Sequence, residues 1–432
     1  MKKRVLAIIT AAALSMGLST GVVQAEESEW EYKEATLTML FSNDTPEAGV
    51  KAVLELAEEK LGITVDIEYR MGGDDGNNLV RTRIATGEIP DLLAYNSGSL
   101  MKMLNPSENF IDFTDDPLVY DRLSETFKQS TGDANGVYGV PLRCAGAGGV
   151  LYSRSMYEKY GLEVPETWED FLANCEVLKE NGEIACFGAF GTPWPIVVPV
   201  FADNANVLAQ EPDFAEKLNA GESWYATTPA ALRSFEKLAE LYPYYNEDMM
   251  AATYDEGCEA IAEGTVGHWF MLTSALATIK DIYGDEAAED VGFFAVPADN
   301  AEDTSLTVWS ADGLYGNKNS EKVEDIKRFM EFYISDEAID AYTQAEAPTG
   351  PYEIKGYTLP DTVLKAVSVD MQKYFDEEKT ALAMEFMTSL SGNDVGIFDN
   401  CTSGLITPEE AAKQYDDELK LSAQQQGYEW AQ

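Results

Sequence analysis

Residues 35–45 read ATLTMLFSNDT, a short apolar run that ends abruptly in polar residues. Such a run is typical of a strand that is buried on both faces of a sheet. Pro46 then opens a helix in which apolar residues recur at intervals of three and four up to Leu61, and Gly62 ends it. The pattern therefore predicts a buried strand followed by an amphipathic helix.

The same alternation of elements continues to residue 99. Residues 63–69 alternate apolar and polar side chains as a strand does, 80–85 belong to a second helical pattern, and 90–95 form another short apolar strand. The order strand, helix, strand, helix, strand predicts a parallel α/β sheet. Ligands of such sheets bind beyond the carboxyl ends of the strands, which here are residues 42–45 and 95–99.

A similar pattern returns beyond Pro141. Thr167 caps a helix with one apolar stripe, and Thr407, Pro408 and Glu410 begin the last helix with a capping box. Further strands are expected at 148–152, 184–190, 266–272 and 293–296, and further helices at 232–241 and 321–334. The 432 residues allow two or three domains or two large lobes, and no low-complexity linker divides them. We therefore expect two α/β lobes.

The amino terminus has the pattern of a secretory signal peptide. Three basic residues at 2–4 precede an apolar stretch at 5–14, which gives way to small residues ending at Ala25. A membrane anchor, the alternative, would need about 20 consecutive apolar residues, and polar residues interrupt this stretch. We expect residues 1–25 to be cleaved and the protein to be exported, either to the periplasm or to the extracellular face of the cell membrane.

The composition is that of a globular protein, but the charge is unusual. There are 76 Asp and Glu against 30 Lys and Arg, so the formal net charge is −46, and loss of the three basic residues of the leader brings it to −49. This surplus of carboxylates repels phosphate backbones and anionic lipid headgroups, because binding to either begins with Lys and Arg neutralising negative charge. We expect no nucleic-acid partner and no anionic membrane as a partner.

The cysteines show no metal-binding spacing. The five are Cys144, Cys175, Cys186, Cys258 and Cys401, and no two form a CxxC pair. An odd number leaves at least one thiol unpaired. Cys175 falls on the apolar stripe of the helix that Thr167 caps, so we expect it in the core. Whether Cys175 and Cys186 form a disulfide is open at this point.

Few catalytic arrangements fit the sequence. The single histidine, His268, lies in a strand-like apolar run, and there is no GxSxG, HExxH or Walker pattern. We therefore expect a structural role for His268, no metal site and no cofactor. A carboxylate pair of the kind that hydrolyses glycosides stays open. The 76 acidic residues supply many candidates for it, but most of them fall on predicted helix faces, where solvation explains them.

Aromatic residues recur beside glycine or proline at predicted strand ends: Tyr95, Trp194, Trp269 and Trp309. Flat aromatic faces suit the apolar C–H faces of sugar rings, while neighbouring amides and carboxylates hydrogen-bond to sugar hydroxyls. Core packing explains any one of these rings equally well. Their gathering at strand ends favours a shared cleft.

Seven short stretches, in this order, resemble one protein family: 87–91 (GEIPD), 136–141 (GVYGVP), 160–171, 261–264, 291–297, 312–314 (DGL) and 407–411 (TPEEA). The sequence resembles the extracellular solute-binding proteins of ATP-binding-cassette importers, in the family 1 sugar-binding branch that includes maltose-binding protein. The resemblance implies a periplasmic-binding-protein fold, in which two α/β lobes are joined by a multi-strand hinge and ligand binds in the cleft between them.

The resemblance also implies chain crossings near Pro141, Thr307 and Pro348. Lobe one would then comprise 30–141 and 307–347, and lobe two would comprise 142–306 and 348–432. Carried over by motif, Asn43 and Asp44 look like the family's polar sugar contacts, and Tyr95 looks like its first-lobe aromatic. Trp194 and Trp269 look like its second-lobe aromatic platforms. Two further candidates, Trp309 and Asp312, lie near a hinge strand.

The function that these features predict is that of a receptor and not of an enzyme. We expect a monomer that captures a neutral sugar or a short oligosaccharide and delivers it to the transmembrane permease of an ATP-binding-cassette importer. One alternative is a receptor for a cation, an amine or a peptide, which would exploit the acidic surface. Another is a secreted glycoside hydrolase, which would share the aromatic cleft.

Overall fold

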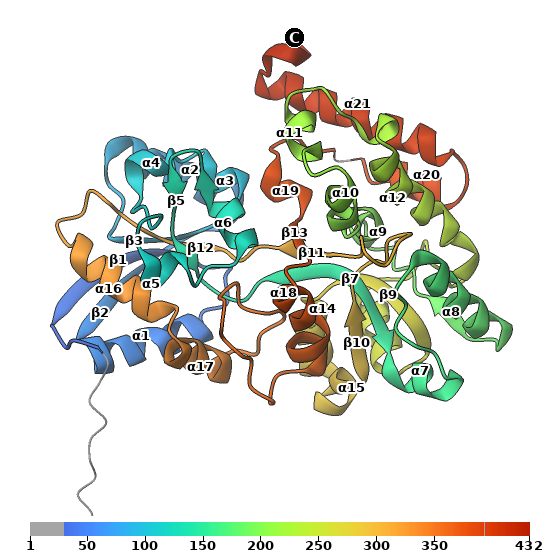
Figure 1. Ribbon diagram of the computed structural model, residues 1–432, viewed down its shortest axis with the longest axis horizontal. Helices are drawn as coiled ribbons and strands as arrows, with labels where there is room; N and C mark the ends of the chain where they lie inside the picture. The colour runs from blue at the N-terminus through green and yellow to red at the C-terminus, as the bar shows by residue number, and fades with distance from the viewer. Residues whose placement is uncertain (1–29, 393) are drawn as a thin grey trace, which may run out of the picture.

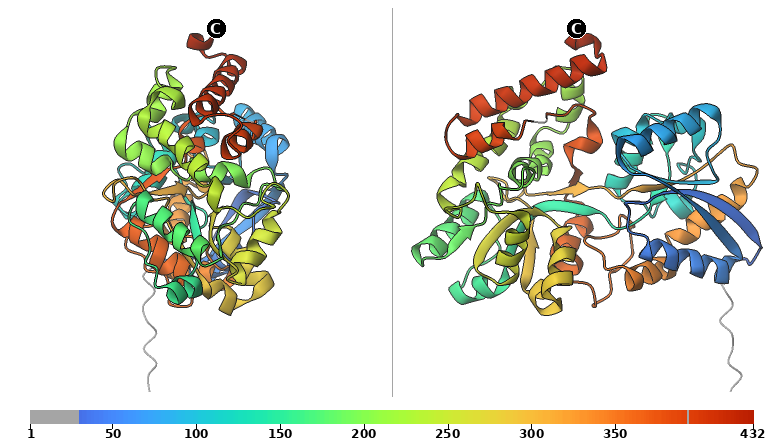
Figure 2. Two further views of the ribbon diagram at one scale, coloured as in Figure 1. Left: turned by 90° about the vertical axis from the view of Figure 1, so that its right-hand side faces the viewer. Right: turned by 180° about the vertical axis from the view of Figure 1, so that it is seen from behind.

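Two α/β lobes lie side by side along the longest axis of the computed structural model (Figure 1). The structure describes residues 30–392 and 394–432, so the expected signal peptide lies outside the described residues. Lobe one is built on the sheet that contains β1, and lobe two on the sheet that contains β7. Figure 2 shows from behind that extended segments join the lobes near the middle of the molecule.

The sheet of lobe one has the strand order β2-β1-β3-β12-β6. Its first three strands are parallel, as the sequence predicts, and β12 and β6 add an antiparallel edge. The strands are β1 (Ala35–Ser42), β2 (Ile63–Arg70), β3 (Leu92–Tyr95), β12 (Gly313–Gly316) and β6 (Val140–Pro141). Because β1, β2 and β3 run in the same direction, their carboxyl ends meet at one edge, facing lobe two.

Helix α1 (Ala48–Leu61) shows why this part of the chain folds as predicted. It buries Val50, Val53 and Ala57 against the sheet, and it ends at Gly62, whose φ of 72° is a left-handed conformation that glycine adopts without strain. The other helices of lobe one are α2 (Gly73–Thr86), α3 (Ser99–Lys102), α4 (Pro106–Asn109), α5 (Pro117–Tyr120), α6 (Glu125–Thr131), α16 (Val323–Tyr333) and α17 (Asp336–Ala345).

The sheet of lobe two is mixed, whereas the sequence pattern suggested a repeat of the first sheet. Its order is β13-β11-β7-β9-β8, with β10 also paired to β7. The strands are β7 (Gly146–Ser153), β8 (Ile184–Cys186), β9 (Val266–Leu272), β10 (Val291–Phe294), β11 (Leu306–Trp309) and β13 (Thr380–Leu382). The central strand β7 is antiparallel to β9, β10 and β11.

Helices cover both faces of this sheet and form a second apolar cluster above it (Figure 1). Helix α8 (Trp168–Glu180) begins with the capping box of Thr167 and Asp170, and α21 (Pro408–Gln426) begins with that of Thr407 and Glu410. The remaining helices are α7 (Arg154–Tyr160), α9 (Val198–Phe201), α10 (Asn204–Gln210), α11 (Phe214–Asn219), α12 (Pro229–Glu240), α13 (Tyr254–Ala262), α14 (Ala275–Tyr283), α15 (Asp285–Asp290), α18 (Gln372–Asp376), α19 (Met384–Met387) and α20 (Gly396–Thr402).

The chain crosses between the lobes three times. The first crossing runs from β6 to β7, the second from β11 to β12, and the third from α17 to the helical turn at Ala366–Met371, which packs near β10. The boundary expected at Thr307 lies inside the sheet of lobe two, because Thr307 pairs with Gly148 of β7 and its hydroxyl donates to the carbonyl oxygen of Ala202 at 2.7 Å. The second crossing therefore falls between Trp309 and Gly313.

One buried carboxylate links two of the crossings to each other and to lobe one. Glu353, in the third crossing, is fully buried and accepts hydrogen bonds from the Thr126 hydroxyl at 2.8 Å, the Ser310 hydroxyl at 2.9 Å and the backbone N–H of Ala311 at 2.9 Å. These donors come from α6 of lobe one and from the second crossing. A buried carboxylate is stable only when hydrogen bonds replace its hydration, as they do here.

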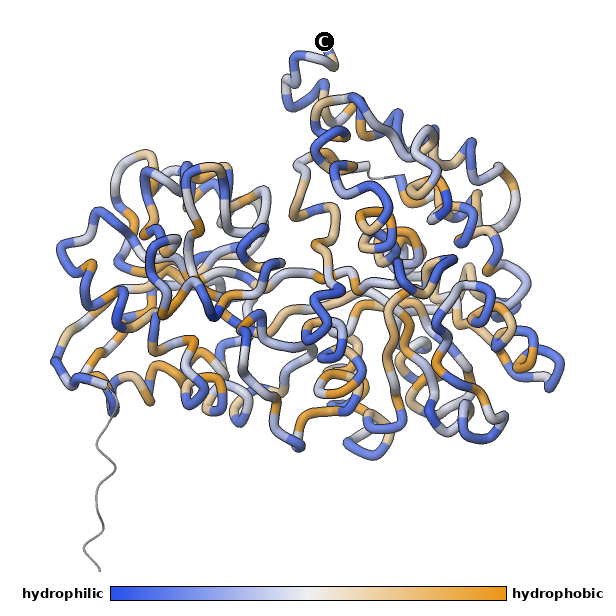
Figure 3. Tube along the Cα trace, in the orientation of Figure 1, coloured by the Kyte–Doolittle hydropathy of each residue, from blue (hydrophilic) through white to orange (hydrophobic). Residues whose placement is uncertain are grey.

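Apolar segments follow the strands and the inward faces of the helices, and the outer loops are hydrophilic (Figure 3). This is the distribution expected for a chain with a buried apolar core. Among the described residues, no helix combines the length and the apolar character needed to cross a bilayer.

Candidate functional site

A cavity of about 480 Å³ lies between the two sheets. Lobe one contributes the loop after β3, lobe two contributes the ends of β7 and β9 together with α19, and all three crossings contribute. Its lining residues are Asn96, Ser97, Ser99, Leu100, Arg143, Cys144, Gly146, Ala147, Leu272, Thr273, Ser274, Trp309, Ser310, Ala311, Asp312, Thr349, Glu385 and Phe386. The cavity has the size and the mixed polar and apolar lining of a small-molecule site.

A second hollow of about 270 Å³ continues the first into lobe one. The two share Asn96, Leu100, Arg143 and Asp312. The second hollow is also lined by Ser42, Asp44, Thr45, Pro46, Arg70, Gly72, Gly73 and Asn77. It therefore lies at the carboxyl ends of β1, β2 and β3, where the topology of a parallel sheet leads us to expect ligand.

Charges in the second hollow are balanced. Arg143 forms a salt bridge with Asp312, with distances of 2.9 Å from Nη2 and 3.1 Å from Nε to the same carboxylate oxygen. Arg70 lies over the ring of Tyr95, 5.2 Å from its centroid, and its buried Nε has no hydrogen-bond partner in the protein. Asp44 accepts a hydrogen bond from Ser42. Two guanidinium groups thus face two carboxylates in one hollow.

The main cavity has an aromatic wall. The ring of Trp309 lies against the backbone of β7, because Gly148 has no side chain there; a Cβ at Gly148 would come within 2.5 Å of the indole. Burial raises the pKa of the nearby Glu385, and a hydrogen bond with Trp309 partly opposes this shift. Trp309 and Glu385 thus give the cavity an indole face beside a carboxyl group.

Three of the residues proposed from sequence line these cavities: Asp44, Trp309 and Asp312. Asn43 is exposed and lines neither cavity. Tyr95 is only 1% exposed and belongs to the core of lobe one, so it supports Arg70 from behind. The position after strand β3 is nevertheless used, because the next residue, Asn96, lines both hollows.

The two tryptophans expected as second-lobe platforms lie away from both cavities. Trp269 is 1% exposed, and its ring packs where Gly257 of α13 leaves room. Trp194 is 39% exposed, and its ring lies 5.7 Å from that of Tyr254, which in turn lies 5.6 Å from Trp269. Trp269 points into the core because alternate residues of β9 face opposite sides of the sheet, and Leu272 is the one that reaches the cavity.

Sequence reasoning missed Arg70, Arg143 and Glu385. Arg70 ends β2, so the rule that singled out the ends of the two other strands also indicates this residue. Arg143 follows Pro141 at a predicted crossing between the lobes, and this position indicates a residue close to the cleft. Glu385 lies on the short helix α19, far along the chain, and no motif marks it.

With this geometry in hand, comparison with known proteins identifies the class. The family model of the bacterial extracellular solute-binding proteins matches residues 42–340, and the chain belongs to this family. The family consists of binding proteins of the cell exterior, and its two-lobed fold is the one observed here, so the predicted fold class is confirmed.

Individual relatives have low sequence identity to this chain, but the similarity extends over most of its length. The melibiose/raffinose/stachyose-binding protein MelE of Bacillus subtilis is 24% identical over 71% of this chain and 72% of its own. The multiple sugar-binding protein of Streptococcus mutans is 21% identical over 65% of this chain and 67% of its own. Among solved structures, the apo form of RafE from Streptococcus pneumoniae superimposes with a TM-score of 0.74 at 15% identity, covering 92% of this chain and 99% of RafE.

Proposed function

We propose that this protein captures a neutral sugar or short oligosaccharide between its lobes and delivers it to the transmembrane permease of an ATP-binding-cassette importer. The observation that carries the proposal is the contrast in charge between the cleft and the whole protein. The protein has a net charge of −46. The hollow beyond β1, β2 and β3, however, sets Arg70 and Arg143 against Asp44 and Asp312.

Balanced donors and acceptors suit sugar hydroxyls. Guanidinium groups donate to hydroxyl oxygens, carboxylates accept from hydroxyl hydrogens, and an uncharged ligand leaves the existing salt bridge of Arg143 and Asp312 in place. The indole face of Trp309 offers an apolar surface to the C–H face of a pyranose ring. The names of MelE and of the multiple sugar-binding protein, both sugar binders, support the same ligand class.

The position of the cavity between two lobes suggests how ligand binding closes the protein. A ligand that fills the cavity would contact the loop after β3 from lobe one and Trp309 and Glu385 from lobe two, because these residues line it. Contacts with both lobes are made together only when the lobes are close, so the ligand stabilises that arrangement by its differential affinity. The crossing segments absorb the motion. The exported location fits this role, with the closed form presented to a permease in the membrane.

A thermal-shift panel tests the ligand class. The protein without residues 1–25 is heated with each of melibiose, raffinose, stachyose, maltose and cellobiose. At least one of these sugars should raise the unfolding temperature, because a ligand that binds the native state stabilises it. Binding of a neutral sugar should barely change with salt concentration. Stabilisation by polyamines or peptides that falls sharply with salt would instead support a receptor for cations, and release of monosaccharides from a bound oligosaccharide would support a hydrolase.

Two tryptophan variants locate the site. We expect Trp309→Ala to weaken binding of the sugar found in the panel by about 2 kcal/mol, roughly thirtyfold in Kd, because the aromatic contact along the cavity wall is lost. Trp194→Ala is the matched control, since Trp194 lines neither cavity. Isothermal titration calorimetry measures both. Equal effects of the two substitutions, or no effect of Trp309→Ala, would remove Trp309 from the proposed site.

A further inference from the structure

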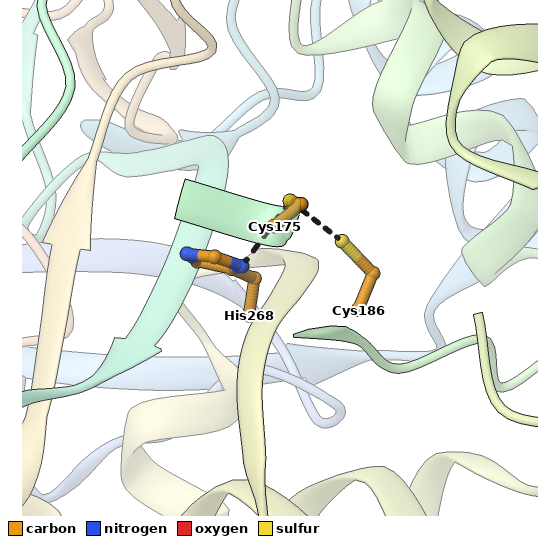
Figure 4. Close-up of side chains that lie close together, drawn as sticks. All are labelled: Cys175, Cys186 and His268. Carbon is orange, nitrogen blue, oxygen red and sulfur yellow. Dashed lines mark hydrogen bonds between the residues drawn. The ribbon is translucent and has the colours of Figure 1, made fainter. Parts of the chain in front are cut away.

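Two buried cysteines of lobe two lie close together outside the ligand cleft. The Sγ atoms of Cys175, on α8, and Cys186, on β8, are 3.7 Å apart, and both residues are 0% exposed (Figure 4). A disulfide bond is about 2.05 Å long, so the sulfur atoms need to approach by less than 2 Å. The strand–helix packing itself already brings the two side chains face to face.

His268 lies beside the two cysteines, but both of its ring nitrogens have other hydrogen-bond partners. Its Nδ1 lies 2.8 Å from the carbonyl oxygen of Ala185 and its Nε2 lies 2.7 Å from the hydroxyl of Tyr157. A carbonyl oxygen only accepts hydrogen bonds, so Nδ1 carries the proton and Nε2 accepts from Tyr157. The nitrogen that faces Cys175, 3.7 Å from its sulfur, is therefore a protonated one and has no lone pair for a metal ion.

The three side chains together resemble part of a metal site, since their ligand atoms lie within 4.8 Å of one another. Structural zinc requires four ligands, each deprotonated. Binding a metal through Nδ1 would break the hydrogen bond to Ala185, and this group offers three ligands at most. The geometry thus favours chemistry between the two sulfur atoms over metal binding.

We propose that Cys175 and Cys186 form a disulfide bond in the exported protein. Proteins of the cell exterior fold where thiols are oxidised, which makes such a bond accessible in this family. The bond would tie the middle of α8 to the end of β8, next to the central strands of lobe two. Cys144, Cys258 and Cys401 would remain as thiols.

The reaction is thiol–disulfide exchange with a disulfide donor, either a small-molecule disulfide or the disulfide of an oxidoreductase. One protein thiolate attacks the donor disulfide, forms a mixed disulfide and releases one donor thiol. The second protein thiolate then attacks the sulfur of the first cysteine and releases the other donor thiol. The two protons and two electrons lost by the cysteines reside in the two donor thiols. Because both sulfur atoms are buried in the folded protein, exchange precedes the packing of α8 on β8.

Counting thiols tests the proposal. The full mature chain, refolded in a mixture of oxidised and reduced glutathione, is denatured and alkylated without reduction, and its intact mass is measured. The expected result is three alkylated cysteines out of five, with a cross-linked pair of peptides containing Cys175 and Cys186 after proteolysis. Five alkylated cysteines would overturn the proposal. Five alkylated cysteines with stoichiometric zinc in the native protein would also overturn it, in favour of a metal site.

Stability provides an independent readout. The oxidised protein should unfold a few degrees above its reduced form, because the bond restricts the unfolded chain. This difference should vanish in Cys175→Ala and in Cys186→Ala and persist in Cys401→Ala, the matched control, whose sulfur is equally buried but bonds to the carbonyl oxygen of Phe235. A difference that survives in Cys175→Ala would contradict the assignment. Sugar binding enters none of these measurements, so they do not depend on the proposed function.

Discussion

Asp416 is a buried acid whose ionisation is coupled to folding. It lies on α21, is 2% exposed, and accepts hydrogen bonds from the backbone N–H groups of Tyr225 at 2.8 Å and Ala226 at 2.9 Å. Burial raises its pKa from 3.8 to about 6, against the effect of these two hydrogen bonds. The folded protein therefore binds a proton at this site more tightly than the unfolded chain does.

We expect Asp416 to make the stability of the protein depend on pH in a defined window. Its contribution is fully present below pH 3.8, where both states hold the proton, and is lost as the pH rises through about 6. The lost contribution is of the order of 3 kcal/mol, since each pKa unit corresponds to about 1.4 kcal/mol. Asp416→Asn should flatten the unfolding free energy between pH 4 and pH 6, measured by urea titration. The exposed Asp121→Asn serves as control, and an unchanged slope in Asp416→Asn would refute this account.

At the scale of single residues, the sequence predicted which strand ends form the site more accurately than it predicted which side chains line it. Asp44 and Asp312 line the cavities, but Tyr95 and Trp269 are core residues. A strand-end position can be read from the sequence, because the sheet topology follows from the pattern. Which face of the strand a ring occupies depends on neighbours such as Gly257, which come from distant parts of the chain.

At the scale of elements, a contact between α3 and α19 closes one side of the main cavity. The Ser99 hydroxyl donates to the carbonyl oxygen of Glu385 at 3.3 Å, and a Cβ at Gly98 would lie 2.8 Å from the Cα of Phe386. Gly98 precedes α3 in lobe one, whereas Phe386 belongs to lobe two. A glycine at this position thus permits the two lobes to meet beside the main cavity.

We expect Gly98→Ala to weaken sugar binding about tenfold, because the added methyl group pushes α19 away and opposes contact of the lobes. It should also lower the unfolding free energy by about 1–2 kcal/mol, since φ is positive at this residue. Gly87→Ala is a matched control: Gly87 has a φ of 71°, but a Cβ there would meet no atom within 4 Å. Calorimetric titration of both variants separates the effects. Equal affinities in the two would show that the contact has no part in binding.

The helices were the elements most predictable from sequence. The Gly62 end of α1 and the capping boxes at Thr167 and Thr407 are local signals, and the structure has each of them. The short strands β11 and β12 were harder, because the four residues of each carry little periodicity and their pairing partners lie far away in the sequence. For the same reason the mixed order of the second sheet could not be read from the chain.

At the scale of the whole molecule, Glu353 joins the lobe connections. Glu353→Ala would leave buried donors of Thr126, Ser310 and Ala311 without an acceptor. We expect a loss of about 3 kcal/mol in unfolding free energy, and a smaller loss for Glu353→Gln, which keeps one acceptor oxygen. Urea unfolding measures both, with the exposed Glu378→Ala as control. A loss no larger than that of the control would show that these hydrogen bonds contribute little.

The interleaving of the two sheets has a consequence for how the protein is made. Strand β12, which lies between β3 and β6 in lobe one, is synthesised after most of lobe two, and β13 of lobe two is synthesised only after α17 of lobe one. Neither sheet can be completed while the ribosome is still working on the first three hundred residues of the chain. Pairings of such long sequence separation form slowly. Both sheets thus stay incomplete until late in translation, and the two lobes finish folding together rather than one after the other.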